Sequence, residues 1–312
     1  MNYVTAALTL ILAAAMVGGC GDDGGTTMDG STADSSTTIP DAGPGETLFY
    51  VASVLGVGQA DPTGDPSVVP GFNLDGLVSD AADPAGCLHA DFTSPAPDNQ
   101  PGVDNQLGPI LSSVGSSIDV EGSLSENILD GSLLLLFELV RVNDRVNDPE
   151  VGLNIYVGQM PAGVDEPADL DGDAIIDPDQ TFDIDPASLE GGEPLVSVSG
   201  ALINGRVNAG PIDIEINLPI EGGLLLNIRD AEVRLSIAGD TITAGIIGGA
   251  LDVAETVMTI VAIDPDAIPE SLARSVLDAQ ADLVPDETGA CTAVSVGLTF
   301  EGITAVRGGV GM

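Results

Sequence analysis

The strongest structural signal in the chain is a strict alternation of apolar and polar residues beyond its middle. From Ile212 to Leu218 an aliphatic side chain occupies every second position, and Asp213, Glu215 and Asn217 lie between them. Successive side chains of a strand point to opposite faces, so the pattern predicts a β-strand with one buried face. Strands of this kind belong to antiparallel sheets, and the fold must therefore supply a core on one side of the segment.

A second alternating segment, Leu226–Ile237, follows after a Gly-rich turn. Its apolar residues occupy even positions up to Ile228 and odd positions from Ala231 onward. The frame slips by one residue at Arg229–Asp230. An extra residue in one strand returns the apolar side chains to a common face, so we predict a β-bulge at this point.

The rest of the folded region is also rich in strand signals. Further strands are predicted at Thr47–Val57, Ser132–Val142, Val151–Val157, Leu195–Ile203 and Val294–Phe300, and helices at Gln106–Val114, Leu251–Ile263 and Pro269–Leu283. The last helix has Pro269 at its first position and Leu272, Val276 and Leu283 on its apolar face. The predicted fold class is α+β and β-dominated: an antiparallel β-sandwich or a strongly curved sheet with a small C-terminal helical cap.

The N-terminus has the pattern of an export signal. Val4–Met16 is a run of thirteen apolar residues and threonines, shorter than the ~20 apolar residues that span a bilayer. It fits the apolar region of a secretory signal, although Met1–Tyr3 contains no basic residue. The following Val17-Gly18-Gly19-Cys20 resembles the lipobox of bacterial lipoproteins. That resemblance implies cleavage before Cys20, lipidation of Cys20 and attachment to a membrane.

The residues after Cys20 predict a tether. Gly21–Gly45 consists mainly of Gly, Ser, Thr and Asp and cannot bury enough apolar surface to fold. We therefore expect a signal peptide at 1–19, the lipidated Cys20 and a disordered tether at 20–46, and a single β-rich domain at 47–312. By similarity to the lipoprotein sorting rule, Gly21 after the cysteine favours the outer membrane, with the domain facing the periplasm or the cell surface.

The charge of the chain excludes several partners. It carries 49 acidic residues and seven basic ones, all arginines, for a formal net charge of −42. Binding to nucleic acid or to anionic headgroups requires a basic surface, so neither is expected. Cations are the natural counterparts. An acidic, lysine-free surface that keeps the protein soluble is the alternative explanation of the charge.

Cys87 and Cys291 are the two cysteines left after Cys20. An even pair in an exported protein predicts a disulfide. The bond would join the two ends of the folded region, which favours one domain over two.

The stretch ADLDGDAIIDPDQTFDID, Ala168–Asp185, contains seven aspartates and no basic residue. Its DxDGDxxxD spacing resembles the calcium loops of EF-hands, dockerins and thrombospondin type 3 repeats. The resemblance implies a structural Ca²⁺ site, with Ile176 anchoring the loop in the core. The implied ligands are the side chains of Asp169, Asp171, Asp173, Asp177 and Asp179 and the carbonyl of Ile175.

Two positions depart from the EF-hand pattern. The sixth position, usually Gly, is Ala174, and the twelfth, usually a bidentate carboxylate, is Gln180. Pro178 also disfavours a helix leaving the loop. The alternative interpretation is a solvated acidic turn.

Enzymatic motifs are missing from the sequence. His89 is the only histidine, and nucleophile-elbow, zinc-protease, P-loop and dinucleotide-binding motifs do not occur. We expect a non-enzymatic envelope protein with a binding or structural role and an unknown protein or small-ligand partner. Two alternatives remain: a carrier for an apolar ligand, supported by the long apolar strands, and a carboxylate-dependent hydrolase. Tryptophan is absent, which disfavours carbohydrate chemistry.

Overall fold

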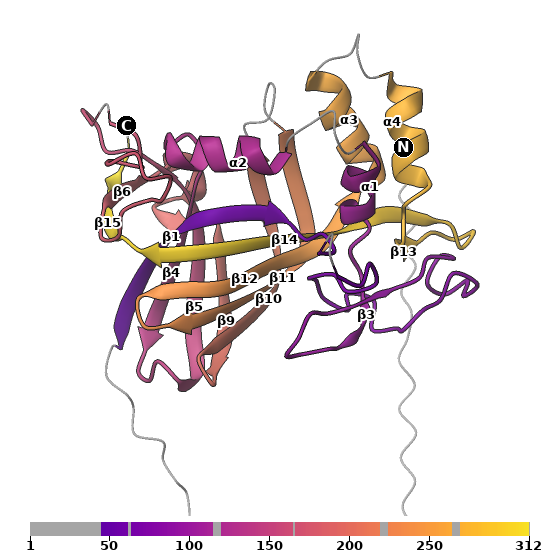
Figure 1. Ribbon diagram of the computed structural model, residues 1–312, viewed down its shortest axis with the longest axis horizontal. Coiled ribbons are helices and arrows are strands. Elements are labelled where there is room, and N and C mark those ends of the chain that lie inside the picture. Colours follow the sequence, from indigo (N-terminus) through magenta and orange to yellow (C-terminus); the bar gives the residue numbers. More distant parts are fainter. Residues whose placement is uncertain are drawn as a thin grey trace, which may run out of the picture. The chain divides into compact units, whose positions relative to one another are not determined.

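The long strands pair in chain order, and the last pairs with the first. In the computed structural model, eight antiparallel strands form this closed ring (Figure 1): β1 (Glu46–Val57), β4 (Leu134–Val142), β5 (Asn147–Gln159), β9 (Val196–Ile203), β10 (Arg206–Leu218), β11 (Leu224–Ala238), β12 (Thr241–Asp252) and β14 (Cys291–Thr304). The β-dominated fold predicted from sequence is confirmed, and of its two forms the strongly curved sheet is realised, closed into a barrel.

The structure describes residues 45–61, 64–114, 120–164, 166–218, 224–263 and 269–311. The predicted signal peptide, Cys20 and nearly all of the predicted tether lie outside these residues. All described residues belong to one compact unit.

Short strands extend or flank the barrel. β6 (Thr181–Ile184) pairs with β5, and β15 (Val306–Val310) pairs in parallel with β6. β13 (Leu283–Pro285) pairs with the first part of β14. Two small two-stranded sheets complete the set: β2 (Phe92–Thr93) with β3 (Pro101–Val103), and β7 (Leu189–Glu190) with β8 (Glu193–Pro194).

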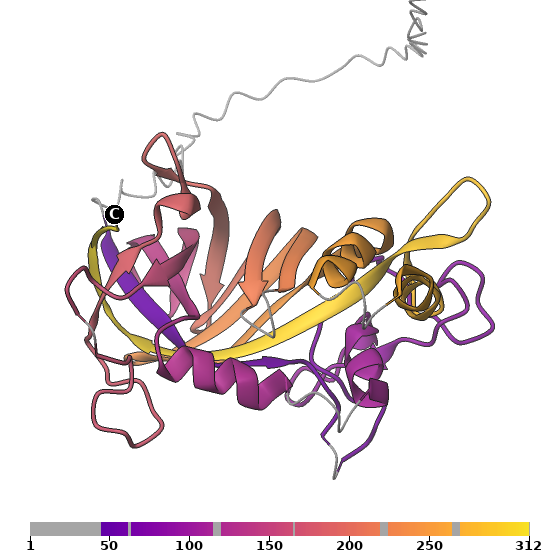
Figure 2. The same ribbon diagram turned by 90° about the horizontal axis from the view of Figure 1, so that it is seen from above.

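Helices lie at two places on the barrel. α2 (Val120–Leu129) runs along β1, whereas α1 (Leu107–Val114), α3 (Val253–Ile263) and α4 (Glu270–Asp278) gather around the first part of β14 (Figures 1 and 2). A short 3₁₀ turn, η2 (Pro186–Ser188), precedes β7. α2 was not predicted from the sequence.

The expected buried face of the last helix is wrong. α4 begins at Glu270, with Pro269 at the N-cap, and ends at Asp278. Its buried residues are Ala273 and Leu277, while Leu272 is 55% exposed. The neighbours α3 and β14 select the buried face, and the small Ala273 allows close packing there.

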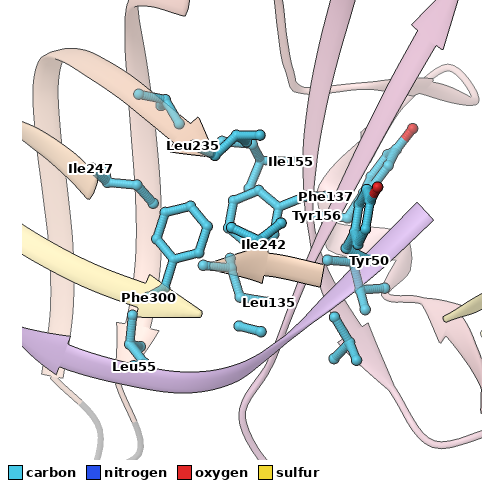
Figure 3. Packing of buried hydrophobic residues seen from close by; sticks show 14 of the residues in the cluster. Tyr50, Leu55, Leu135, Phe137, Ile155, Tyr156, Leu235, Ile242, Ile247 and Phe300 are labelled. Atoms are coloured by element: carbon cyan, nitrogen blue, oxygen red, sulfur yellow. The ribbon is translucent and has the colours of Figure 1, made fainter. Parts of the chain in front are cut away.

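The barrel interior is filled by side chains. The Phe137 ring of β4 stacks on the Phe300 ring of β14, with centroids 4.4 Å apart, and Leu135 and Ile155 lie beside them (Figure 3). Eight-stranded barrels are just wide enough for such filling. The opposite face of β4 is also buried, because Leu136 and Glu138 lie beneath neighbouring elements. β4, which lies within the strand predicted at Ser132–Val142, is therefore buried on both faces.

Two bulges shape the β10–β11 hairpin. The first is at Arg229–Asp230 as predicted: the register shifts there, and Asp230 has a left-handed φ of 49°. The second is in β10 between Ala209 and Ile212. Pro211 has no amide hydrogen and cannot continue a ladder. The β9–β10 pairing accordingly ends at the pair Ala209–Gly200, so β9 and β10 part from one another beyond it.

Candidate functional site

Three of the predicted metal ligands converge. The carboxylates of Asp169, Asp171 and Asp173 offer oxygens that all lie within 4.8 Å of one another. The chain between β5 and β6 that carries them, here called the acidic loop (Asp169–Gln180), coils so that alternate side chains share one side. The structure therefore contains a group of carboxylates that could hold a metal ion.

Backbone amides fix the carboxylates in this loop. Asp169 accepts hydrogen bonds from the N–H groups of Gly172 (2.8 Å) and Ala174 (2.9 Å). Asp171 accepts from the Asp173 N–H (3.2 Å), and Asp173 from the Ile175 N–H (3.0 Å). Each bond leaves carboxylate lone pairs free, because an ionised carboxylate has about four acceptor sites. The loop thus orients its acids before any ion binds.

The sixth position has the backbone that an EF-hand loop requires. Ala174 has a φ of 67° and Gly172 a φ of 78°, both left-handed. This conformation costs an alanine about 1–2 kcal/mol, which glycine avoids. Alanine therefore replaces the usual glycine at the sixth position without changing the local turn.

Both ends of the acidic loop are fastened to the barrel. The Asp169 N–H donates to the Leu129 carbonyl at the end of α2 (3.0 Å), and the Asp179 N–H donates to the Thr304 carbonyl of β14 (2.9 Å). Ile176 is fully buried, as predicted. Gln180 closes the loop, since its side-chain amide donates to the carbonyls of Ala168 (2.7 Å) and Asp177 (3.2 Å).

The other predicted ligands lie outside the carboxylate group. Asp177 and Asp179 are not among the three acids within 4.8 Å of one another. The Asp177 Oδ2 atom is nevertheless buried without a hydrogen-bond partner among the described residues. The Ile175 side chain is 58% exposed at the tip of the loop, and Asp179 takes a left-handed φ of 61°.

No arginine relieves the charge of the acidic loop. Each of the seven arginines forms an ion pair, with Glu46, Asp98, Glu138, Glu150, Asp213, Glu255 or Glu270 as partners. Within the described part of the chain, none of these partners belongs to the loop. The pKa of Asp173 is raised by partial desolvation and by the charges of Asp171 and Asp169.

The donor set suits a hard divalent cation. It offers carboxylate and carbonyl oxygens without a sulfur or imidazole, which is the preference of Ca²⁺ and Mg²⁺. Ca²⁺ takes six to eight oxygens at about 2.3–2.6 Å in flexible geometry. The converging carboxylates of Asp169, Asp171 and Asp173 could supply part of such a shell, and the unpartnered oxygen of Asp177 is an additional donor nearby in sequence. The residues present therefore fit a hard divalent metal ion.

A separate hollow of about 620 Å³ opens at one end of the barrel. We call it the barrel-end hollow. Its buried apolar lining comes from the start of β4, the end of β5, the end of β10 and the start of β11: Leu135, Ile155, Ile214 and Ile228. In an antiparallel barrel these strand ends meet at the same rim. The hollow lies where β9 and β10 have parted.

Charged and amide side chains surround this apolar lining. Arg229 donates to Asp213 (3.3 Å) and to Glu255 of α3 (3.2 Å), and Glu255 also accepts from the side-chain amide of Asn227. Asp185 and Glu215 complete the carboxylates of the lining. The sequence did not predict this site, although Arg229, at the predicted bulge, lines it.

The predicted disulfide is present. Cys87 and Cys291 are bonded, with Cα atoms 6.0 Å apart across 204 residues of sequence. The bond joins the long segment before α1 to the start of β14. His89 lies beside it in a shallow hollow, and burial lowers the pKa of His89.

Buried carboxylates near this disulfide were not predicted. Asp104 and Asp282 are 3% and 6% exposed. Burial raises their pKa values to about 7 and about 6, and hydrogen bonds from Leu74 N–H and from Ser295 oppose the shift in part. Asp104 accepts from the N–H groups of Leu74 and Asp75 within the segment before α1. Asp282 helps to hold that segment against β14, because the Ser295 hydroxyl that donates to Asp282 also accepts the Gln106 N–H (2.8 Å).

Comparison with known protein families, curated proteins and solved structures finds no match for this chain. Among the described helices, none is long and apolar enough to cross a membrane.

Proposed function

We propose that the protein is a lipid-anchored cell-envelope protein whose barrel carries a structural calcium site in the acidic loop. The observation that carries the proposal is the convergence of Asp169, Asp171 and Asp173 within 4.8 Å, with no cation from the chain paired to them among the described residues. Three ionised carboxylates so close repel one another, and a bound divalent cation removes that repulsion.

The calcium ion would act on the junction between elements. The acidic loop is attached to α2 through Leu129 and to β14 through Thr304, and the Gln180 carbonyl accepts the Val306 N–H of β15 (2.7 Å). An ion that draws the carboxylates together stiffens the loop and therefore holds these three elements in place. This role is structural, and it needs no opening of the fold.

Anchoring is the second part of the proposal and rests on the lipobox-like Val17-Gly18-Gly19-Cys20. A lipidated Cys20 followed by a polar tether would hold the barrel near a membrane, in our proposal the outer membrane. The strongly negative barrel would then stand off an anionic surface and attract cations. A binding or structural role, without catalysis, fits this arrangement best.

Thermal unfolding of the full-length protein with calcium and with a chelator tests the metal site. Calcium at about 100 times its Kd should stabilise the fold by roughly 2.7 kcal/mol, a shift of about 5 °C for a domain of this size. Asp171→Ala with Asp173→Ala should lose the shift. Glu190→Ala with Glu193→Ala removes the same charge from the β7–β8 hairpin and should keep it.

Magnesium and the loop variant together distinguish a calcium site from general screening. A shift that survives the loop variant would mean that cations act on the acidic surface as a whole, and an equal magnesium shift that the variant loses would mean that the loop does not select calcium. The absence of any calcium shift would make the acidic loop a solvated turn. Mass spectrometry of the mature N-terminus tests lipidation of Cys20 separately, and a protein still carrying residues 1–19 would contradict the anchor.

A further inference from the structure

The barrel-end hollow has two kinds of lining in one space. Its deepest residues are the interior side chains of four strand ends, and they are at most 3% exposed. The interior beneath them is closed by packed side chains, including the stacked Phe137 and Phe300 (Figure 3). The hollow is therefore a pocket with an apolar bottom and not a passage through the barrel. Its volume of about 620 Å³ falls within the ~300–1,000 Å³ of small-molecule sites.

The bulge of β10 creates the opening. Beyond the Ala209–Gly200 pair, β10 stays paired with β11 while β9 stays paired with β5. Residues of both faces of β10 therefore reach the hollow, the apolar Ile214 and the acidic Asp213 and Glu215. A continuous ladder would have kept the acids on the outer surface, away from the interior side chains.

The charge of the lining is one-sided. Among the described residues, four carboxylates line the hollow, from Asp185, Asp213, Glu215 and Glu255, against the single guanidinium of Arg229. Arg229 is already engaged by Asp213 and Glu255. The hollow keeps an excess of negative charge next to an apolar surface, and a ligand that matches both must carry a positive group on a hydrocarbon chain.

We propose that the barrel-end hollow binds a small amphiphilic cation, an alkyl amine or alkyl quaternary ammonium compound. Its hydrocarbon chain lies against the partly exposed aliphatic lining, Val157, Val196 and Leu225, and its cationic group lies among the carboxylates of the rim. An alkyl carboxylate of the same length is repelled by the rim. A wholly apolar ligand leaves the carboxylates of the rim without a cationic partner. Its binding is favoured only by contact with the small apolar lining.

The proposal is tested with hexyltrimethylammonium as the probe. Calorimetric titration uses the full-length protein in nanodiscs of a zwitterionic lipid, with empty nanodiscs subtracted. Hexanoate keeps the chain and reverses the charge, and tetramethylammonium keeps the charge and removes the chain. Hexyltrimethylammonium should bind at least about tenfold more tightly than tetramethylammonium, because each buried methylene favours binding. Hexanoate should not bind measurably.

Two variants locate the site. Asp213→Asn with Glu215→Gln should weaken binding about fivefold or more, since exposed charge pairs contribute at this level. The matched control, Asp278→Asn with Glu287→Gln, removes the same charge outside the hollow and should leave binding unchanged. Leu195 lies at the rim and is 53% exposed, so the fold should tolerate a larger side chain there. Leu195→Trp adds bulk at the rim and should abolish binding.

Four results would overturn the proposal. Equal binding of tetramethylammonium would mean that cations are only counter-ions of an acidic surface. Binding of hexanoate at similar strength would remove the charge selection. Equal effects of the two charge variants, or undiminished binding to the Leu195→Trp protein, would place the probe elsewhere. The calcium site is independent of these four results, because none of these variants touches the acidic loop.

Discussion

The side-chain amide of Gln180 donates to the carbonyl of Ala168, twelve residues earlier, at 2.7 Å. This bond ties the exit of the acidic loop to its entry. Glutamine occupies the position where EF-hand-like loops place a chelating carboxylate. An ionised glutamate could not donate these hydrogen bonds. The side-chain amide of Gln180 therefore closes this loop, whereas a carboxylate that binds the ion closes an EF-hand-like loop.

Gln180→Ala should therefore loosen the acidic loop. The variant loses two hydrogen bonds, to Ala168 and to Asp177, and a typical hydrogen bond contributes about 1 kcal/mol. We expect a loss of about 1–2 kcal/mol in the free energy of unfolding in the presence of chelator, measured by urea denaturation. Gln159→Ala, at the end of β5, is the control for loss of a glutamine. A loss no larger than in that control would mean that the loop is held by its other contacts.

Ala174→Gly should stabilise the protein. The left-handed φ of 67° at Ala174 is strained for alanine, and glycine removes the strain while adding about 0.4–1 kcal/mol of unfolded-state entropy. The expected net gain is about 0.5–1 kcal/mol, read from the denaturation midpoint. Ala244 in β12 does not have a left-handed φ, so Ala244→Gly should destabilise the protein. Stabilisation of both, or of neither, would contradict the assigned loop geometry.

The local elements could be predicted from the sequence, because their signals are local. The alternation around Ile214, the frame slip at Asp230 and the burial of Ile176 each depend on a few neighbouring residues. The closure of the barrel could not be predicted this way. Its β1–β14 pairing joins residues such as Tyr50 and Thr304. These residues are far apart in sequence, and no local pattern around either one identifies the other as its partner.

The errors and omissions have the same cause. Leu272 is more apolar than Ala273, so periodicity alone placed Leu272 in the core. In the structure, the face of α4 that carries Ala273 packs against α3 and β14. Asp104 and Asp282 lie in polar segments that look solvent-exposed, and only the folding of the segment before α1 onto β14 buries them. The three converging acids of the acidic loop were predictable because their spacing is local.

The fold should become less stable as the pH rises from about 4 to 7. Burial raises the pKa of Asp104 to about 7 from 3.8, with Asp75, Asp282 and Asp91 adding repulsion. A carboxyl group with a raised folded-state pKa contributes most below its unfolded pKa and loses that contribution as it ionises. The difference between the folded and unfolded pKa values of Asp104 corresponds to at most roughly 4 kcal/mol of unfolding free energy.

Asp104→Asn isolates this effect. The asparagine keeps a side-chain oxygen that can accept the Leu74 N–H, bonded at 2.6 Å in the present structure, but it cannot ionise. The variant should match the parent protein near pH 4 and exceed it in unfolding free energy near pH 8, measured by urea denaturation across this range. Glu287→Gln, on an exposed turn, serves as the charge control. Parallel pH profiles for Asp104→Asn and the parent protein would show that Asp104 does not titrate in this window.

Removal of Arg307 should be the most damaging single loss of an arginine. Arg307 of β15 lies 2.7 Å from the Glu138 carboxylate, whose side chain is 4% exposed, and Asn154 and Tyr156 donate to its other oxygen. Arg307→Met keeps apolar bulk but leaves this buried charge without a cation, which typically costs about 3–5 kcal/mol. Arg145→Met, which breaks the exposed pair with Glu46, should cost at most about 1 kcal/mol.

Glu138→Gln separates charge from packing. In the Arg307→Met protein it removes the unpaired carboxylate, keeps an oxygen that can accept from Asn154 and Tyr156, and should restore most of the lost unfolding free energy. Urea denaturation of the two single variants and the double variant measures this coupling. Additive losses, or equal losses for Arg307→Met and Arg145→Met, would mean that the Arg307–Glu138 pair contributes no more than an exposed ion pair. In that case β15 would be held to the barrel by its other hydrogen bonds, which include its pairing with β6 and the bond from the Val306 N–H to the Gln180 carbonyl.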